Sequence, residues 1–122
     1  MRLRMIFVVL LIACTGSPTD AELVGNYAIQ YSYGQETLSL KGGGSYEQVF
    51  VSKEGKVLRN SAKWEMRGQT LLLQNAMDVD DGFGNFGDPS KRWDWWLKPE
   101  RSGHKIVIVV NPDRKERYEK QR

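Results

Sequence analysis

The amino-acid sequence predicts an all-β protein, a single small antiparallel up-and-down β-barrel of about eight strands. Along residues 36–75, short runs of alternating polar and apolar residues follow one another, and glycine turns separate them. A period of two with glycine turns is typical of half-buried antiparallel strands joined by hairpins. Elsewhere, no stretch of useful length has the period of a helix. A meander has two free edges, and closure into a barrel removes both.

Each expected strand has its own signature. Leu38 and Leu40 share one face of their run, and Trp64 lies on the apolar face of another. The continuous apolar run after Lys105 is typical of a strand that is covered on both sides. Turn residues, above all glycine, separate the runs. The eight expected strands are Tyr27–Tyr33, Glu36–Lys41, Ser45–Ser52, Val57–Met66, Gln69–Gln74, Trp93–Lys98, Lys105–Val110 and Arg114–Lys120.

The first thirteen residues have the features of a secretory signal rather than of a barrel strand. Arg2 and Arg4 precede the apolar run Met5–Ile12, whose eight residues are too few to cross a bilayer as a helix. A basic start followed by a short apolar run is typical of a cleaved signal peptide. We therefore expect three segments: a signal peptide at 1–13, a short linker segment at 14–21 and the barrel domain at 22–122.

The residues Leu11-Ile12-Ala13-Cys14 resemble the lipobox of bacterial lipoproteins. That resemblance implies cleavage before Cys14 and a thioether-linked diacylglycerol on its sulfur, which makes the membrane one partner of the chain. An ordinary signal peptide and a chance cysteine are the alternatives. Thr15 stands where an inner-membrane retention signal has aspartate. The resemblance thus implies the bacterial cell envelope, and within it the periplasmic face of the outer membrane.

The charge of the chain argues against nucleic acid as a partner. The whole sequence has 18 basic and 15 acidic residues, a net charge of +3. Two of the basic residues, Arg2 and Arg4, belong to the expected signal peptide, so the mature chain is close to neutral. Nucleic-acid-binding domains usually carry a strong basic patch, and this chain has none in its sequence pattern.

The residue types of the chain do not favour an enzyme. Cys14 is the only cysteine and His104 the only histidine, which leaves few routes to acid–base or nucleophilic catalysis. His104 is expected to be a solvated turn residue. Asp78, Asp80 and Asp81 resemble a calcium loop in composition, but their spacing to glycine does not match the EF-hand register. We expect no metal and no cofactor, and a loop made soluble by its aspartates.

One long connection, Asn75–Arg92, has no consistent period and is the candidate functional loop. Loops of this length are uncommon in compact domains and are often functional. Its phenylalanines, Phe83 and Phe86, either fold back as a lid over the barrel or remain exposed as a contact patch. Trp96 is the best candidate for an outward anchor, and packing under a neighbouring loop is its alternative. The candidate contact residues are Phe83, Phe86, Trp96, Asp78, Asp80 and Asp81.

Several short motifs resemble those of small bacterial lipocalin-like (calycin-type) lipoproteins. Gly25-Asn26-Tyr27 is similar to the lipocalin Gly-x-Trp opening, with tyrosine in place of tryptophan. The other motifs are Leu38-x-Leu40, Gly44-Ser45-Tyr46, Lys63-Trp64-Glu65 and Leu71-x-Leu73. The resemblance implies an up-and-down barrel, and no particular ligand.

The number of aromatic side chains bears on the interior of the barrel. An eight-stranded barrel is only just wide enough to hold its own side chains or one small ligand. Seven large rings favour a filled interior, with binding at the rim or the outer face. The rings expected to point inward are Tyr27, Tyr31, Tyr46, Phe50, Trp64, Trp93 and Trp95.

Together these observations predict a lipid-anchored envelope protein that binds an envelope protein or a small ligand and is not an enzyme. The alternative is a proteinaceous inhibitor of an envelope or host hydrolase, because small β-barrel lipoproteins include lysozyme inhibitors. An inhibitor is expected to expose one protruding loop, and Asn75–Arg92 is the candidate.

Overall fold

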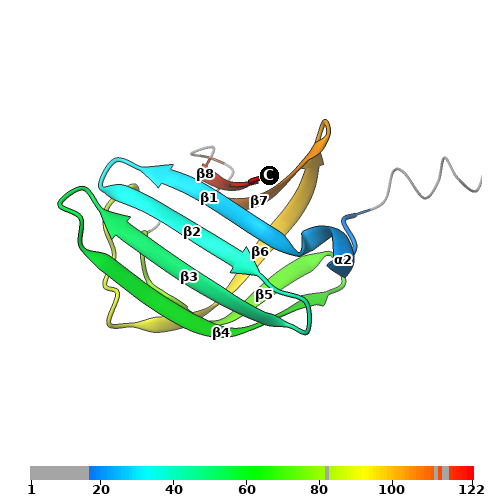
Figure 1. The fold of residues 1–122 in the computed structure, drawn as a ribbon, viewed down its shortest axis with the longest axis horizontal. Coiled ribbons are helices and arrows are strands. Elements are labelled where there is room, and N and C mark those ends of the chain that lie inside the picture. The colour runs from blue at the N-terminus through cyan, green and yellow to red at the C-terminus, as the bar shows by residue number, and fades with distance from the viewer. Residues whose placement is uncertain (1–16, 82, 112, 114–115) are drawn as a thin grey trace, which may run out of the picture.

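The computed structural model describes residues 17–81, 83–111, 113 and 116–122, and its strands form one closed antiparallel barrel (Figure 1). Each strand pairs with the next one in sequence, and β1 pairs with β8, so the barrel is of the simple up-and-down type. The predicted fold class is confirmed. The elements are α2 (Asp20–Leu23), β1 (Gly25–Tyr31), β2 (Gly34–Leu40), β3 (Ser45–Ser52), β4 (Val57–Arg67), β5 (Thr70–Met77), β6 (Arg92–Ser102), β7 (Lys105–Asn111) and β8 (Glu116–Lys120).

At the long connection, both flanking strands extend further than the sequence pattern predicts. β5 continues to Met77 and β6 begins at Arg92, so the long connection shrinks from Asn75–Arg92 to residues 78–91. A β-bulge explains the missed end of β5: its register against β6 shifts between Leu73 and Ala76, which interrupts the alternation. Among the described residues, no helix is long and apolar enough to cross a membrane.

The helix α2 covers one end of the barrel, which we call the closed end. Thr19 and Glu22 form a capping box at its start, and the side chain of Leu23 is fully buried. The Tyr27 hydroxyl donates to the Leu23 carbonyl at 2.7 Å. From the far end of the chain, the Lys120 ammonium donates to the Glu22 carbonyl. The chain therefore enters the barrel at the closed end.

The opposite end, which we call the open end, carries the β1–β2 turn, the β3–β4 turn and the loop at 78–91 (Figure 1). Strand order dictates this arrangement, because alternate connections of an up-and-down barrel lie at the same end. His104 lies in the β6–β7 turn at the closed end and is exposed, as its sequence context predicts.

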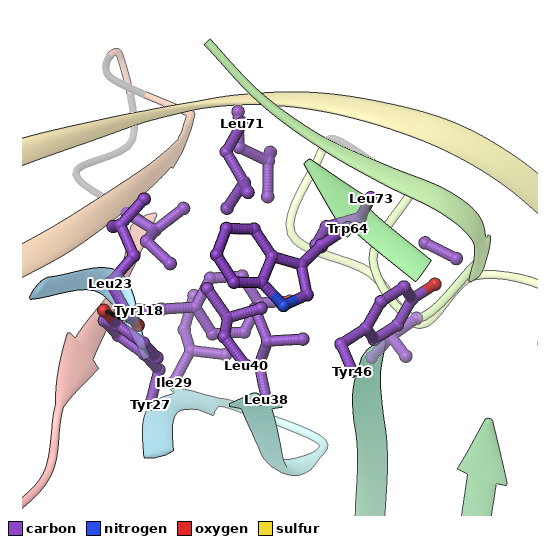
Figure 2. Packing of buried hydrophobic residues seen from close by; sticks show 14 of the residues in the cluster. Leu23, Tyr27, Ile29, Leu38, Leu40, Tyr46, Trp64, Leu71, Leu73 and Tyr118 are labelled. Carbon is purple, nitrogen blue, oxygen red and sulfur yellow. Dashed lines mark hydrogen bonds between the residues drawn. The ribbon is translucent and has the colours of Figure 1, made fainter. Parts of the chain in front are cut away.

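Trp64 lies at the centre of the core, among leucines of β2 and β5 (Figure 2). Its indole N–H donates to the Lys41 carbonyl at 3.0 Å, which satisfies the one polar atom of the ring. Five of the seven rings expected inside are buried, namely Tyr27, Tyr31, Tyr46, Phe50 and Trp64.

The prediction for Trp93 is wrong, and that for Trp95 holds in part. Trp95 is partly buried and packs against the core. Trp93 is 52% exposed. It lies near the start of β6 and pairs with Ala76, beyond the β5 bulge. The register between the two strands has shifted there, so the alternation that places Trp95 and Leu97 does not extend to Trp93.

Candidate functional site

A cavity of about 780 Å³ lies at the open end of the barrel. Its apolar wall is formed by Tyr33, Phe50, Leu58 and Phe86, which come from the β1–β2 turn, β3, β4 and the 78–91 loop. Polar groups surround it, chiefly Ser52, Lys53, Glu54 and Lys56 of the β3–β4 turn and Asp88 and Ser90 of the loop. The volume falls within the range of small-molecule sites, roughly 300–1,000 Å³.

The floor of the cavity is a cluster of aromatic rings. Phe86 packs on Phe50 with ring centroids 5.2 Å apart and on Tyr33 at 5.5 Å. Tyr33 in turn stacks on Tyr31 at 4.9 Å, with the two planes 7° apart. Gly34 permits this packing, because a Cβ at that position would lie 2.6 Å from the Phe50 ring. Phe86 and Tyr33 supply most of the apolar surface that faces the cavity, because Phe50 is 1% exposed beneath them.

The two phenylalanines of the loop do different things. Phe86 folds back onto the barrel, and 43% of it remains exposed. Phe83 is 78% exposed and projects from the loop. The lid alternative therefore describes Phe86, and the exposed alternative describes Phe83.

The loop aspartates accept hydrogen bonds that shape the loop. The Tyr33 hydroxyl donates to the Asp80 carboxylate at 2.7 Å, which ties the β1–β2 turn to the loop. The Asp81 carboxylate accepts the backbone N–H groups of Phe83 and Asn85. Within the described residues, no group of three or more histidine, cysteine, aspartate or glutamate side chains is arranged to hold a metal ion. The aspartates thus order the loop that carries Phe86.

Burial raises the pKa of the Tyr33 hydroxyl well above its ordinary value, and the hydrogen bond to Asp80 raises it further. Tyr33 therefore stays protonated and keeps its bond to the Asp80 carboxylate at any physiological pH. Hydrogen bonds from the Ser90 hydroxyl and backbone lower the pKa of Asp88, so this rim carboxylate is ionised.

A buried carboxylate lies beside the cavity floor. Glu36 pairs with Phe50 across the β2–β3 ladder and is fully buried. It accepts hydrogen bonds from Gln48 at 3.0 Å, from Tyr31 at 3.3 Å and from Tyr118 at 2.5 Å. Burial raises its pKa to about 7, and these three bonds limit the rise. The carboxyl is thus divided between its two protonation states near neutral pH.

Glu36 and Gln48 were missed in the sequence, although a signal for both was present. Glu36 has the same parity as Leu38 and Leu40, and Gln48 lies between the inward residues Tyr46 and Phe50. Alternation alone therefore places both side chains inside the barrel.

Trp96 lies on the outer wall, away from the cavity, as the alternation predicts. It is 54% exposed, and the Arg67 guanidinium lies over its ring at 5.6 Å from the centroid. Of the six candidate contact residues, Phe86 lines the open-end cavity, and Asp80 forms a β-bridge with it. Asp80 and Trp96 line a second hollow of about 400 Å³. Phe83 and Trp96 are exposed but separate, and their role as contacts stays a prediction.

Comparisons with protein-family models, curated proteins and solved structures found no match. The fold and the cavity therefore define the class: a small eight-stranded antiparallel barrel, consistent with a lipocalin-like barrel, with one covered end and a ligand-sized cavity at the other. Cys14, the predicted lipidation site, lies outside the described residues.

Proposed function

We propose that the chain is a lipid-anchored envelope protein that binds a small apolar molecule at the open end of a lipocalin-like barrel, without catalysis. The observation that carries the proposal is the cavity of about 780 Å³ with its floor of stacked aromatic rings. Sites for small molecules are concave and mostly apolar, with a few polar groups at fixed places. This cavity has each of these properties.

The position of the chain start supports the anchor. The described chain enters at α2, on the closed end, and the cavity lies at the other end. A lipid on Cys14 would hold the closed end close to the bilayer, since the five residues from Thr15 to Thr19 span at most roughly 18 Å. The cavity would then open away from the membrane, on the periplasmic side of the outer membrane.

The polar groups near the cavity support binding rather than catalysis. The Tyr33 hydroxyl donates a hydrogen bond to the Asp80 carboxylate, and the Asp88 carboxylate accepts one from the Ser90 hydroxyl. Both hydrogen bonds fix the loop, so we assign these groups to its structure rather than to a reaction. His104 lies at the closed end of the barrel.

A fluorescence titration tests this proposal. The probe is N-phenyl-naphthylamine, whose emission rises in apolar surroundings, and the protein is the full-length chain with Cys14→Ser, which cannot be acylated. We expect saturable binding that weakens about tenfold with Phe86→Ala, equivalent to about 1.4 kcal/mol of lost contact. Phe83→Ala is the matched control and should bind like the parent. Absence of saturable emission, or equal binding by both variants, would contradict the proposal.

Inhibition of a hydrolase is the second candidate function, and the exposure of Phe83 favours it. The loop that carries Phe83 is ordered by Asp81, and an ordered, projecting apolar residue suits insertion into an enzyme cleft. A panel of lysozymes and peptidoglycan hydrolases, assayed with added protein, tests it. Inhibition that Phe83→Ser removes and Phe86→Ala preserves would support this candidate over the first.

A further inference from the structure

Among the residues that the structure describes, one edge of β4 has no backbone partner near the open end. β4 pairs with β3 along Val57–Lys63, but it pairs with β5 only along Trp64–Arg67. The bulge in β5 explains the difference. Asn75 adopts a left-handed conformation with φ of 50°, its N–H donates to the Asp94 carboxylate, and the strand leaves β4 at this point.

Beyond the bulge, side chains inside the barrel, rather than the backbone of β4, bond the backbone of β5. The Tyr46 hydroxyl donates to the Gln74 carbonyl at 2.6 Å, and the Asn60 amide donates to the Asn75 carbonyl at 2.9 Å. The Gln48 side chain bonds both the N–H and the carbonyl of Met77. Side chains of β3 and β4 therefore satisfy the backbone hydrogen-bonding groups of β5 beyond the bulge. The backbone groups of β4 that would otherwise pair with β5 are left without it.

The register of β4 against β3 shows which backbone N–H and carbonyl groups of β4 have no strand partner. The Ser52 N–H donates to the Lys56 carbonyl, and the Trp64 N–H donates to the Gly44 carbonyl. The backbone N–H and carbonyl groups of even-numbered β4 residues therefore point toward β3. In an antiparallel ladder the next residues point their N–H and carbonyl the other way. These are Val57, Arg59 and Ser61, and no described residue bonds their backbone on that side.

This free edge borders the cavity and is exposed to solvent. Leu58 lines the cavity from β4, Val57 is 48% exposed, and Arg59 and Ser61 are exposed. Exposed strand edges recruit other strands, so most proteins cover or blunt them. Here the edge lies open beside an apolar hollow, which is the arrangement used for strand addition by an extended peptide.

We propose that the edge of β4 at Val57–Ser61 binds an extended, acidic segment of a partner protein as an added strand. Alternate side chains of the segment would be apolar and would enter the cavity beside Leu58. The intervening side chains would be acidic, because the outward-facing residues of Val57–Lys63 include Arg59 and Lys63 and no carboxylate. Arg59 lies 3.9 Å from Glu47 of β3, and its side chain stays 67% exposed beside that pair. Opposite charges on paired strands stabilise the pairing.

Other occupants of the edge fit less well. In a second copy, antiparallel pairing of two β4 edges would place Arg59 opposite Arg59 or near Lys63, and like charges across a ladder are unfavourable. The described chain begins at the closed end, whereas Val57 is the first residue of β4 at the open end. A partner of opposite charge remains the occupant that the surface fits.

The test uses a fluorescein-labelled peptide, Glu-Phe-Glu-Val-Glu, and its counterpart with lysine for glutamate, titrated by anisotropy against the full-length Cys14→Ser chain. We expect the acidic peptide to bind and the basic one not to bind. Ser61→Pro removes an N–H that no described residue accepts, and it should weaken binding tenfold or more, while Ser61→Ala should change binding less than twofold. Arg59→Glu should reverse the preference between the peptides.

Amide hydrogen exchange locates the bound peptide. Addition of the acidic peptide should slow exchange at Val57, Arg59 and Ser61, while the N–H groups of Leu58 and Asn60 are protected from the start by β3. Arg59→Glu carries the test alone if Ser61→Pro fails to fold, as judged by circular dichroism. Failure of both peptides to bind at roughly 1 mM, or binding that none of these variants changes, would overturn the inference.

The inference goes beyond the proposed function, and the two can fail separately. Saturable dye binding without peptide binding would retain the cavity and reject the edge. Peptide binding with the expected amide protection, but without dye binding, would do the reverse.

Discussion

The two ends of the barrel are built in different ways. At the closed end, α2 is tied down by Lys120 and by a bidentate contact of Arg101 with Glu22, and the leucine core lies beneath it. The hydrogen bonds from Arg101 and from the Thr19 backbone lower the pKa of Glu22 to about 2. At the open end, the strands separate at the β4–β5 seam, and side chains such as Asn60 complete the closure.

This difference indicates a division of tasks. The closed end joins early and late parts of the chain through contacts that span most of the sequence. The open end places a buried carboxyl, an aromatic cluster and an unpaired strand edge around a cavity. A buried carboxyl and an unpaired strand edge cost stability, and proteins keep such features mainly where they bind something. Substitutions at the two ends should therefore affect different measurements.

The largest effect is expected from Trp64→Ala. Trp64 is 6% exposed and lies in the leucine core near the closed end, so truncation should lower the free energy of unfolding by about 3–5 kcal/mol. Trp93→Ala is the matched control, because Trp93 is 52% exposed, and it should cost less than about 1 kcal/mol. Urea melts measure both. Equal losses for the two variants would contradict the contrast.

The next effect is a pH dependence that originates at the open end. Burial raises the pKa of Glu36 from 4.5 to about 7, with Asp80 adding to the rise. The folded state therefore favours the protonated form, so this contribution is complete below about pH 4.5 and is lost as pH rises through 7. The loss amounts to about 3 kcal/mol. Urea melts from pH 4.5 to 8 should show it for the parent chain, and Glu36→Gln should flatten the curve. An unchanged slope in Glu36→Gln would assign the pH dependence to another group.

Local patterns predicted most of the strands, and contacts between distant residues explain what they missed. Alternation over residues 36–73 identified β2, β3 and β4, because each has one face in the core. The end of β5 was missed because Gln48 and Tyr46, far away in sequence, satisfy its backbone. The free edge of β4 follows from the same contacts, and no pattern within β4 itself reveals it.

The candidate site was predicted in part for a related reason. The sequence singled out the long loop and its two phenylalanines, but their separate roles depend on Tyr33 and Phe50, which Phe86 contacts and Phe83 does not. A filled interior was expected, and aromatic side chains do fill its core. The cavity lies at the open end, between the β3–β4 turn and the loop.

A smaller effect is expected from Tyr33→Phe. The substitution removes the hydroxyl that donates to Asp80 at 2.7 Å and leaves the ring cluster intact. A hydrogen bond to a charged group contributes about 1.5 kcal/mol, and the partly exposed Asp80 can recover some of this from water. Unfolding free energy should fall by that amount or less, and amide exchange should speed up in the 78–91 loop. Unaltered exchange there would show that the bond does not hold the loop.

The smallest effects come from the two loop phenylalanines, and their difference is the sharpest comparison within the open end. Phe86→Ser removes packing against Phe50 and Tyr33 and should cost about 1 kcal/mol, less than a core truncation because 43% of Phe86 is exposed. Phe83→Ser removes a ring that is 78% exposed and should change stability by less than about 0.5 kcal/mol. Thermal melts of the two variants side by side give the answer. A larger loss for Phe83→Ser than for Phe86→Ser would mean that Phe83, rather than Phe86, covers the cavity in solution.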